Sequence, residues 1–173
     1  MEAKIKIGIL FIIIVFGILL AVLISYQPQP KEFVTNRTFE TRSDLFFYYE
    51  ITKYPSSAEV LPIQLTQERL TIGVVLDPWN LNFGTIPAGN NFGTRFINLV
   101  NKKENDVKIR LKVYGNITPF VNFSKNNFIL LPKENVTLEV HFYAATAKIG
   151  NYSGEIDIVA QRPKYGFLYS FWG

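Results

Sequence analysis

The sequence contains no cysteine and only one histidine. Without cysteine the chain can form no disulfide bond, present no thiol nucleophile and bind no metal through thiolate ligands. His141 alone falls short of the several imidazole ligands of a zinc site, and no nucleophile-elbow motif accompanies it. The sequence also lacks an Asp-x-Asp-x-Asp calcium loop and a phosphate-binding loop. We therefore expect no catalytic residues, no cofactor and no metal, and a protein that is not an enzyme.

Concentrated charge is missing as well. The chain carries 18 Lys and Arg against 14 Asp and Glu, a formal net charge of +4. This small surplus is not the basic footprint of a nucleic-acid-binding protein, so we expect no nucleic acid partner. Hydrophobic residues make up 48% of the chain and aromatic residues 15%, which is enough for a packed core.

One long apolar run stands near the N-terminus. Residues 7–24 read IGILFIIIVFGILLAVLI, without a charge or a strongly polar group. As a helix this run spans roughly 27 Å, close to the hydrocarbon thickness of a bilayer. It predicts one N-terminal transmembrane α-helix within residues 1–25, which contacts the lipid bilayer through residues 7–24.

The residues beside this run predict its orientation. Lys4 and Lys6 precede it, so the positive-inside rule leaves the N-terminus in the cytoplasm. Residues 27–173 then lie outside the cell, on a single-pass protein of the cell membrane. The run ends in Leu23-Ile24-Ser25-Tyr26 without a small-x-small cleavage site, which favours an uncleaved signal anchor over a removed signal peptide. A third interpretation is a pilin-type leader cut near Gly8, with the apolar helix forming a filament core.

Glycosylation acceptor motifs agree with an external location. Five Asn-x-Ser/Thr motifs occur, none with proline in the middle, and such motifs mark surface loops of exported proteins. The alternative is a β protein that is simply rich in Asn and Thr. The candidate glycosylation sites are Asn36, Asn116, Asn122, Asn135 and Asn151.

Beyond residue 26 the chain shows strand patterns and no amphipathic helix of useful length. Val107 to Val113 alternates most cleanly, Val136 to Phe142 follows the same rule, and so does Gly154 to Ala160. In the last of these, Glu155 and Asp157 fall on the face that we expect to be solvated. Short strands separated by turn signals predict an all-β fold, an antiparallel β-sandwich.

Four segments follow the anchor. Residues 26–32 form a proline-containing stalk, and residues 33–69 an additional extended segment packed on the sandwich. Within that segment, Leu45 to Tyr49 suits a strand or an aromatic patch at the membrane interface, and Tyr54-Pro55-Ser56-Ser57 is expected to break the chain. Leu70 to Leu76 begins the β-sandwich of residues 70–162. Residues 163–173 are an aromatic tail.

A family resemblance covers residues 70–160. Leu81 to Gly89 reads φ-x-F-G-x-φ-x-x-G, Phe96 to Asn101 is a strand ending in Asn, Phe128 to Glu134 precedes another strand, and Gly150 to Ile156 reads G-x-Y-x-G-x-φ. In this order the segments resemble the immunoglobulin-like domains grouped with hydin and the major sperm protein. Asn101 can satisfy backbone groups where its strand ends.

This resemblance implies an immunoglobulin-like antiparallel β-sandwich that serves as a non-enzymatic adhesion or scaffold module. A looser resemblance, in anchor, topology and size but without a shared motif, is to the membrane-anchored β-sandwich stator subunits of the archaeal motility filament. Those subunits bind the surface layer.

Two surface features are candidate partner contacts. Lys108, Arg110 and Lys112 form a basic stripe, which is either an ordinary solvated strand face or a contact for acidic glycan or anionic lipid. The aromatic tail either packs back on the sheet as a strand, against residues 45–49, or is donated to a neighbouring subunit, or rests at the membrane interface. Its candidate contact residues are Tyr165, Phe167, Tyr169, Phe171 and Trp172.

These observations predict a non-catalytic, membrane-anchored extracytoplasmic interaction or scaffold protein. Its sandwich would contact another envelope or surface protein, or a glycan. The first alternative is a subunit of a surface filament, pilin-like or strand-donating, and a homo-oligomer is compatible with either function. The second alternative is an envelope enzyme, which a concave pocket with two buried carboxylates would favour. His141 is expected on the outward face of its strand.

Overall fold

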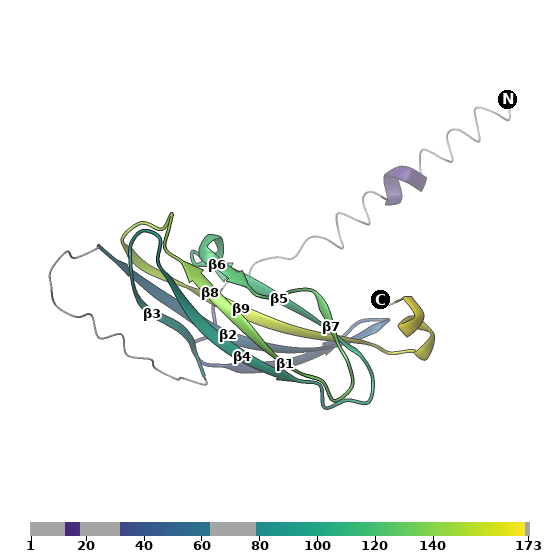
Figure 1. The fold of residues 1–173 in the computed structure, drawn as a ribbon. Helices are drawn as coiled ribbons and strands as arrows, with labels where there is room; N and C mark the ends of the chain where they lie inside the picture. The colour runs from purple at the N-terminus through teal and green to yellow at the C-terminus, as the bar shows by residue number, and fades with distance from the viewer. Residues whose placement is uncertain (1–12, 18–31, 63–78, 172–173) are drawn as a thin grey trace, which may run out of the picture. The chain divides into compact units, whose positions relative to one another are not determined.

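The computed structural model describes residues 13–17, 32–62 and 79–171 (Figure 1). The chain divides into two compact units, Met1–Lys31 and Glu32–Gly173. Residues 13–17 are α-helical, and the predicted membrane anchor at residues 7–24 lies mostly outside the described residues. In the part of the chain that the structure describes, no helix has the length and apolarity needed to cross a membrane.

The second unit is an all-β fold, as predicted. Its larger sheet, here called sheet A, has the strand order β1-β2-β9-β5-β7. β3 also pairs with β2, along the part of β2 that follows its pairing with β1. Its strands are β1 (Thr38–Ser43), β2 (Phe47–Leu61), β3 (Leu81–Pro87), β5 (Val107–Gly115), β7 (Phe128–Leu130) and β9 (Gly150–Pro163). The predicted strands at residues 107–113 and 154–160 are confirmed as β5 and part of β9.

The smaller sheet, sheet B, consists of three strands in the order β4-β8-β6. They are β4 (Phe92–Val100), β8 (Asn135–Tyr143) and β6 (Val121–Phe123), and β8 confirms the strand predicted from Val136. The inner faces of the two sheets share one hydrophobic core, in which Leu138, Val140 and Phe142 of β8 are fully buried with Val60 and Ile156 of sheet A. Apolar residues at every second position produce this two-layered arrangement.

The segment of residues 33–69 contributes strands to sheet A. β2 runs without a break through Tyr54, Pro55, Ser56 and Ser57, so the predicted chain break is wrong. On one side of β2, the pairing with β1 ends at Lys53 and the pairing with β3 begins at Ser56. Among the described residues no strand pairs with Pro55 on that side, so its missing N–H costs no ladder hydrogen bond there.

Sheet A is not purely antiparallel, which corrects the prediction. β3 pairs parallel to β2, from Ser56 opposite Leu81 to Leu61 opposite Pro87. A parallel pair needs a crossover of a dozen or more residues, and residues 62–80 provide that length. The strand predicted at Leu70 to Leu76 lies within this connection, outside the described residues.

Asn101 holds the end of β4 to its surroundings, as the sequence predicts. Its buried side-chain Nδ2 donates to the carbonyl oxygens of Asn105, Leu130 and Leu131 at 2.9–3.0 Å, and its Oδ1 accepts the Lys103 N–H at 3.0 Å. One amide therefore satisfies backbone groups of the β4–β5 loop and the end of β7. A buried polar group with this many partners is costly to remove.

We predict that Asn101→Ala lowers the free energy of unfolding by about 2–3 kcal/mol, because it leaves several partly buried backbone groups without partners. Urea unfolding monitored by tryptophan fluorescence measures this change. The matched control is Asn98→Ala, since Asn98 is exposed on the other face of β4 and its side-chain oxygen accepts a hydrogen bond from the exposed Thr137 hydroxyl. Equal losses in the two variants would contradict the role assigned to Asn101.

Candidate functional site

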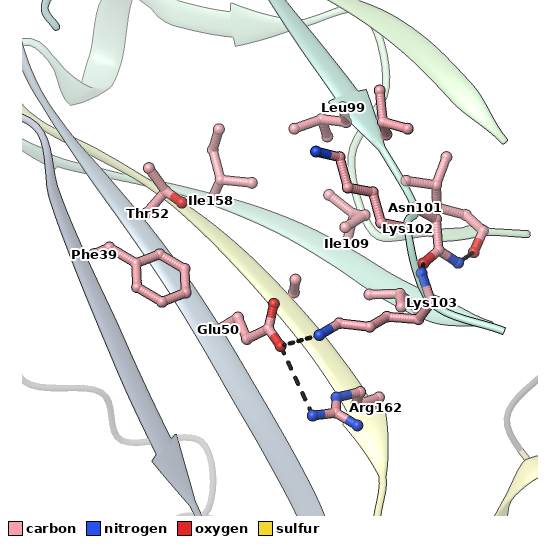
Figure 2. Close-up of a pocket in the computed structure, with 14 residues that line it drawn as sticks. Phe39, Glu50, Thr52, Leu99, Asn101, Lys102, Lys103, Ile109, Ile158 and Arg162 are labelled. Atoms are coloured by element: carbon pink, nitrogen blue, oxygen red, sulfur yellow. Dashed lines mark hydrogen bonds and ion pairs between the residues drawn. The ribbon is translucent and has the colours of Figure 1, made fainter. Parts of the chain in front are cut away.

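A groove with a volume of about 280 Å³ opens between the two sheets, on the side of β1 and β4. Its floor is the inner face of sheet A, and its other wall is the end of β4 with the loop that follows. Eight of its lining side chains are apolar, and the charged ones lie toward that loop. The lining residues are Phe39, Glu50, Thr52, Leu99, Val100, Asn101, Lys102, Lys103, Val107, Ile109, Leu130, Ile158, Ala160 and Arg162 (Figure 2).

The groove exists because sheet A is wider than sheet B. β1 is exposed along its whole length. Phe39 pairs with Thr52 on the inner face of sheet A and remains 64% exposed. Sheet B places no strand over this part of sheet A in the described residues, so apolar side chains that would otherwise join the core line the groove. An apolar surface of this kind is typical of a binding site.

Two strand edges border the groove. Within the described residues β1 pairs only with β2, and β4 pairs only with β8. Phe39 of β1 and Leu99 of β4 both contribute to the groove lining. A strand edge without a neighbour presents backbone N–H and C=O groups that can pair with an extended segment of another chain.

Ion pairs lie at the polar end of the groove. The Glu50 carboxylate is 3.1 Å from Lys103 Nζ and 3.7 Å from an Arg162 guanidinium nitrogen, as the dashed lines in Figure 2 show. All three side chains are 31–46% exposed, so each pair contributes little to stability, about 0–1 kcal/mol. Their main effect is to join β2 and β9 to the β4–β5 loop across the groove.

The groove carries a surplus of positive charge. Lys102, Lys103 and Arg162 line it together with a single carboxylate, that of Glu50, and Lys102 forms no ion pair among the described residues. The Arg162 Nε atom is buried and has no hydrogen-bond partner in the same part of the chain. A ligand with an acidic group beside apolar groups therefore complements this groove.

The predicted basic stripe lies on the opposite, outer face of sheet A. Lys108, Arg110 and Lys112 alternate along β5 with the buried Ile109 and Leu111. On β9 they face Gln161, Val159 and Asp157 in that order. The stripe therefore borders one acidic side chain of its own sheet, that of Asp157, and it does not line the groove.

Glu155 and Asp157 are buried, which corrects their predicted solvated position. They are 1% and 7% exposed, because β9 is a central strand covered on both faces. The Val34 N–H, from the segment before β1, donates to Glu155 Oε2 at 2.8 Å. Glu155 Oε1 and Asp157 Oδ1 have no hydrogen-bond partner among the described residues. The alternation of apolar and polar residues along β9 does not reveal that its polar face is covered as well. The sequence therefore contains no clear indication that Glu155 and Asp157 are buried.

The environment of Asp157 favours its protonated form. Burial, a hydrogen bond with Glu155 and the charge of Glu155 raise the pKa of Asp157 from 3.8 to about 7. Lys53 and Lys112, which pair with Asp157 from the two neighbouring strands, lower the pKa but do not cancel the rise. The two acids lie on the face of sheet A away from the groove, so they cannot act on a ligand bound there.

All five candidate glycosylation sites are exposed. Asn122 lies in β6 and Asn135 begins β8, while Asn151 lies near the start of β9. Asn36 precedes β1, and Asn116 follows β5, where its Oδ1 accepts the Ser153 N–H at 2.7 Å.

The aromatic tail does not form the predicted strand. β9 continues to Pro163, where it pairs with Phe47 of β2, and Gly166–Phe171 is a 3-10 helix. The end of β9 therefore pairs with residues 47–49, but this pairing stops at Pro163, before the aromatic residues of the tail. Tyr165 and Phe167 stack on each other with ring centroids 5.9 Å apart and remain exposed. Trp172 lies outside the described residues.

His141 lies on the outer face of sheet B, as predicted. Its Nδ1 is 2.9 Å from the Thr94 hydroxyl, and its Nε2 is 3.2 Å from the Glu139 carboxylate. Among the described residues, no three His, Asp or Glu side chains are grouped so that they could hold a metal ion. No protein-family model matches the chain, and a search of curated proteins finds no match either.

We predict that the stability of the folded unit falls as the pH rises from about 4 to about 7. The folded state keeps a proton on Asp157 in this range while the unfolded chain has lost it, because the pKa of Asp157 is raised. The free energy of unfolding therefore decreases by up to about 1.4 kcal/mol per pH unit and levels off above pH 7. Asp157→Asn should remove this slope in urea unfolding across the pH range.

Asp44→Asn is the matched control. Burial raises the pKa of Asp44, but hydrogen bonds from the Tyr49 hydroxyl and from the Phe46 and Phe47 N–H groups outweigh it, and the pKa is lowered. Its contribution to stability is therefore constant above about pH 4 and is lost only at lower pH. A slope that persists in Asp157→Asn would show that another group carries the pH dependence.

Proposed function

We propose that this chain is a non-catalytic interaction protein of the cell envelope. Residues 7–24 anchor it in the cell membrane, its N-terminus is cytoplasmic, and residues 32–173 form an extracellular immunoglobulin-like β-sandwich. The sandwich binds another envelope or surface protein. Two packed sheets with a shared core, and the order of the motifs from Leu81 to Ile156, support the immunoglobulin-like assignment and its resemblance to the hydin and major sperm protein domains.

The observation that carries the proposal is the groove between β1 and β4. An extended partner segment can lay apolar side chains on its floor, place one acidic side chain beside Lys102 and Arg162, and pair its backbone with a strand edge. The apolar floor supplies affinity, and the surplus of positive charge selects an acidic partner. This recognition needs no catalytic group.

A second function, the surface-filament subunit, is favoured by the same two strand edges. If the bound segment comes from another copy of this chain, each subunit can extend the sheet of the next one. Such head-to-tail contacts generate filaments when the rotation between subunits does not close a ring. The two functions differ in the identity of the bound segment.

We predict that the soluble unit, residues 31–173, captures an acidic envelope protein and that Phe39→Glu weakens capture by about tenfold or more. The substitution places a negative charge on the apolar floor and repels an acidic partner. Affinity capture from solubilised membranes with mass spectrometry identifies the partner, and biosensor titration of the purified partner gives the dissociation constants.

Phe96→Glu is the matched control, because Phe96 is 65% exposed compared with 64% for Phe39 but lies on the outer face of sheet B. The proposal requires that Phe96→Glu binds like the wild type. Equal weakening by both substitutions would place the binding surface elsewhere. Capture of this chain alone would support the filament function instead, and recovery of no envelope component would count against both.

A further inference from the structure

The outer face of sheet B carries a cluster of three rings. Phe92 begins β4, and His141 and Tyr143 lie on the adjacent strand β8. The ring centroids of the three residues are 5.7–5.8 Å apart in every pair. Phe92 is 59% exposed and Tyr143 is 42% exposed, so the cluster presents its rings to the outside of the sheet.

Polar groups hold the imidazole ring of this cluster in place. His141 contacts the Thr94 hydroxyl through Nδ1 and the Glu139 carboxylate through Nε2, at 2.9 and 3.2 Å. The imidazole is thereby held beside both Phe92 and Tyr143 and is only partly exposed. Exposed aromatic rings beside oriented polar groups suit a ligand that has both an apolar face and hydroxyl or amide groups.

A glycosylation motif stands directly beside this cluster. Asn122 of β6 pairs with His141 of β8, so their side chains share the outer face about 5 Å apart, and Tyr143 is its diagonal neighbour. The Asn122 Oδ1 accepts the Phe123 N–H at 2.8 Å. This contact leaves Nδ2, the atom that carries a sugar in N-glycosylation, directed away from that N–H.

Among the described residues, none of the other four asparagines pairs with a residue of such a ring cluster. Asn151 pairs with Glu59 in sheet A, and Asn135 pairs with Val100 at the far end of β4. Asn36 and Asn116 lie outside the strands. Position in the register therefore singles out Asn122.

We propose that Asn122 carries an N-linked glycan whose first sugars pack on the rings of Phe92 and Tyr143. The C–H face of a pyranose is apolar and covers the exposed rings, while its hydroxyl and acetamido groups meet His141 and Glu139. The cell's transferase moves the oligosaccharide from a lipid-linked phosphate donor. A bond forms between Asn122 Nδ2 and sugar C1, the bond from C1 to the phosphate oxygen breaks, and the amide loses one proton.

The glycan would cover the most aromatic part of sheet B and leave the groove on the other side of β4 accessible. The inference depends on the external location in the proposed function, but it does not depend on the groove. The glycan inference and the proposed function can therefore fail separately. Occupancy of the other motifs will show whether the domain is external even if Asn122 is unoccupied.

The test uses the full chain, produced in a glycosylating secretory host and purified in detergent. Glycopeptide mass spectrometry measures the occupancy of all five motifs. NMR of the intact protein measures the chemical shifts of the sugar protons at Asn122, and thermal unfolding is compared among the wild type, Asn122→Gln, Phe92→Ala with Tyr143→Ala, and the combination. Asn151→Gln is the matched control on sheet A.

We expect Asn122 to be occupied and its sugar protons to shift upfield through the ring currents of Phe92 and Tyr143. Asn122→Gln should lower the melting temperature by about 2–5 °C, with no further loss when the rings are already replaced. Asn151→Gln should leave the melting temperature unchanged.

Each contrary result overturns the inference in a different way. An unoccupied Asn122 beside other occupied motifs refutes it and leaves the external location standing. Occupancy of none of the five motifs refutes it and also counts against that location. A glycan at Asn122 with unshifted sugar protons, or with a thermal effect that does not depend on Phe92 and Tyr143, refutes the packing on the rings.

Discussion

The long antiparallel pairing of β2 with β9 is the interaction on which the rest of the structure depends. Phe47 to Val60 pairs in register with Gly150 to Pro163, and the other edge of β9 pairs with β5. The register leaves no room for a side chain at Gly154, because a Cβ there would collide with the Tyr114 carbonyl oxygen. A shift of one residue would move every side chain of β9 to the wrong face.

Because β9 lies in the middle of sheet A, its side chains enter two different environments, the hydrophobic core and the outer face of the sheet. Its inner side chains, such as Ile156 and Ile158, join the core, while Glu155 and Asp157 are enclosed on the outer face. The groove opens on the inner side only. The two buried carboxylates, whose surroundings raise the pKa of Asp157, therefore lie on the face of sheet A away from the groove.

The alternation of apolar and polar residues predicted a strand correctly where one face of that strand is buried and the other is exposed to solvent. The strands containing Leu111 and Val140 were predicted correctly, and so was the structural role of Asn101 at a strand end. The prediction failed where the neighbouring strands and segments, and not the local sequence pattern, decide the environment of a residue. Pro55 was expected to break the chain, but it lies where β2, in the part of the chain that the structure describes, has no paired strand on one side. Glu155 was expected in solvent, but β9 has strands on both sides and the N-terminal segment above it.

The sequence by itself determined the all-β class, most strand positions in sheet B and the exposure of the glycosylation motifs, because these follow from alternation and from polar turn residues. Its long apolar run also predicts a membrane anchor, which remains a prediction. Only the tertiary structure decided the parallel pairing of β3, the burial of the acids and the groove between β1 and β4. These features depend on which strands become neighbours, and hydrophobic periodicity within one strand carries no information about its partners.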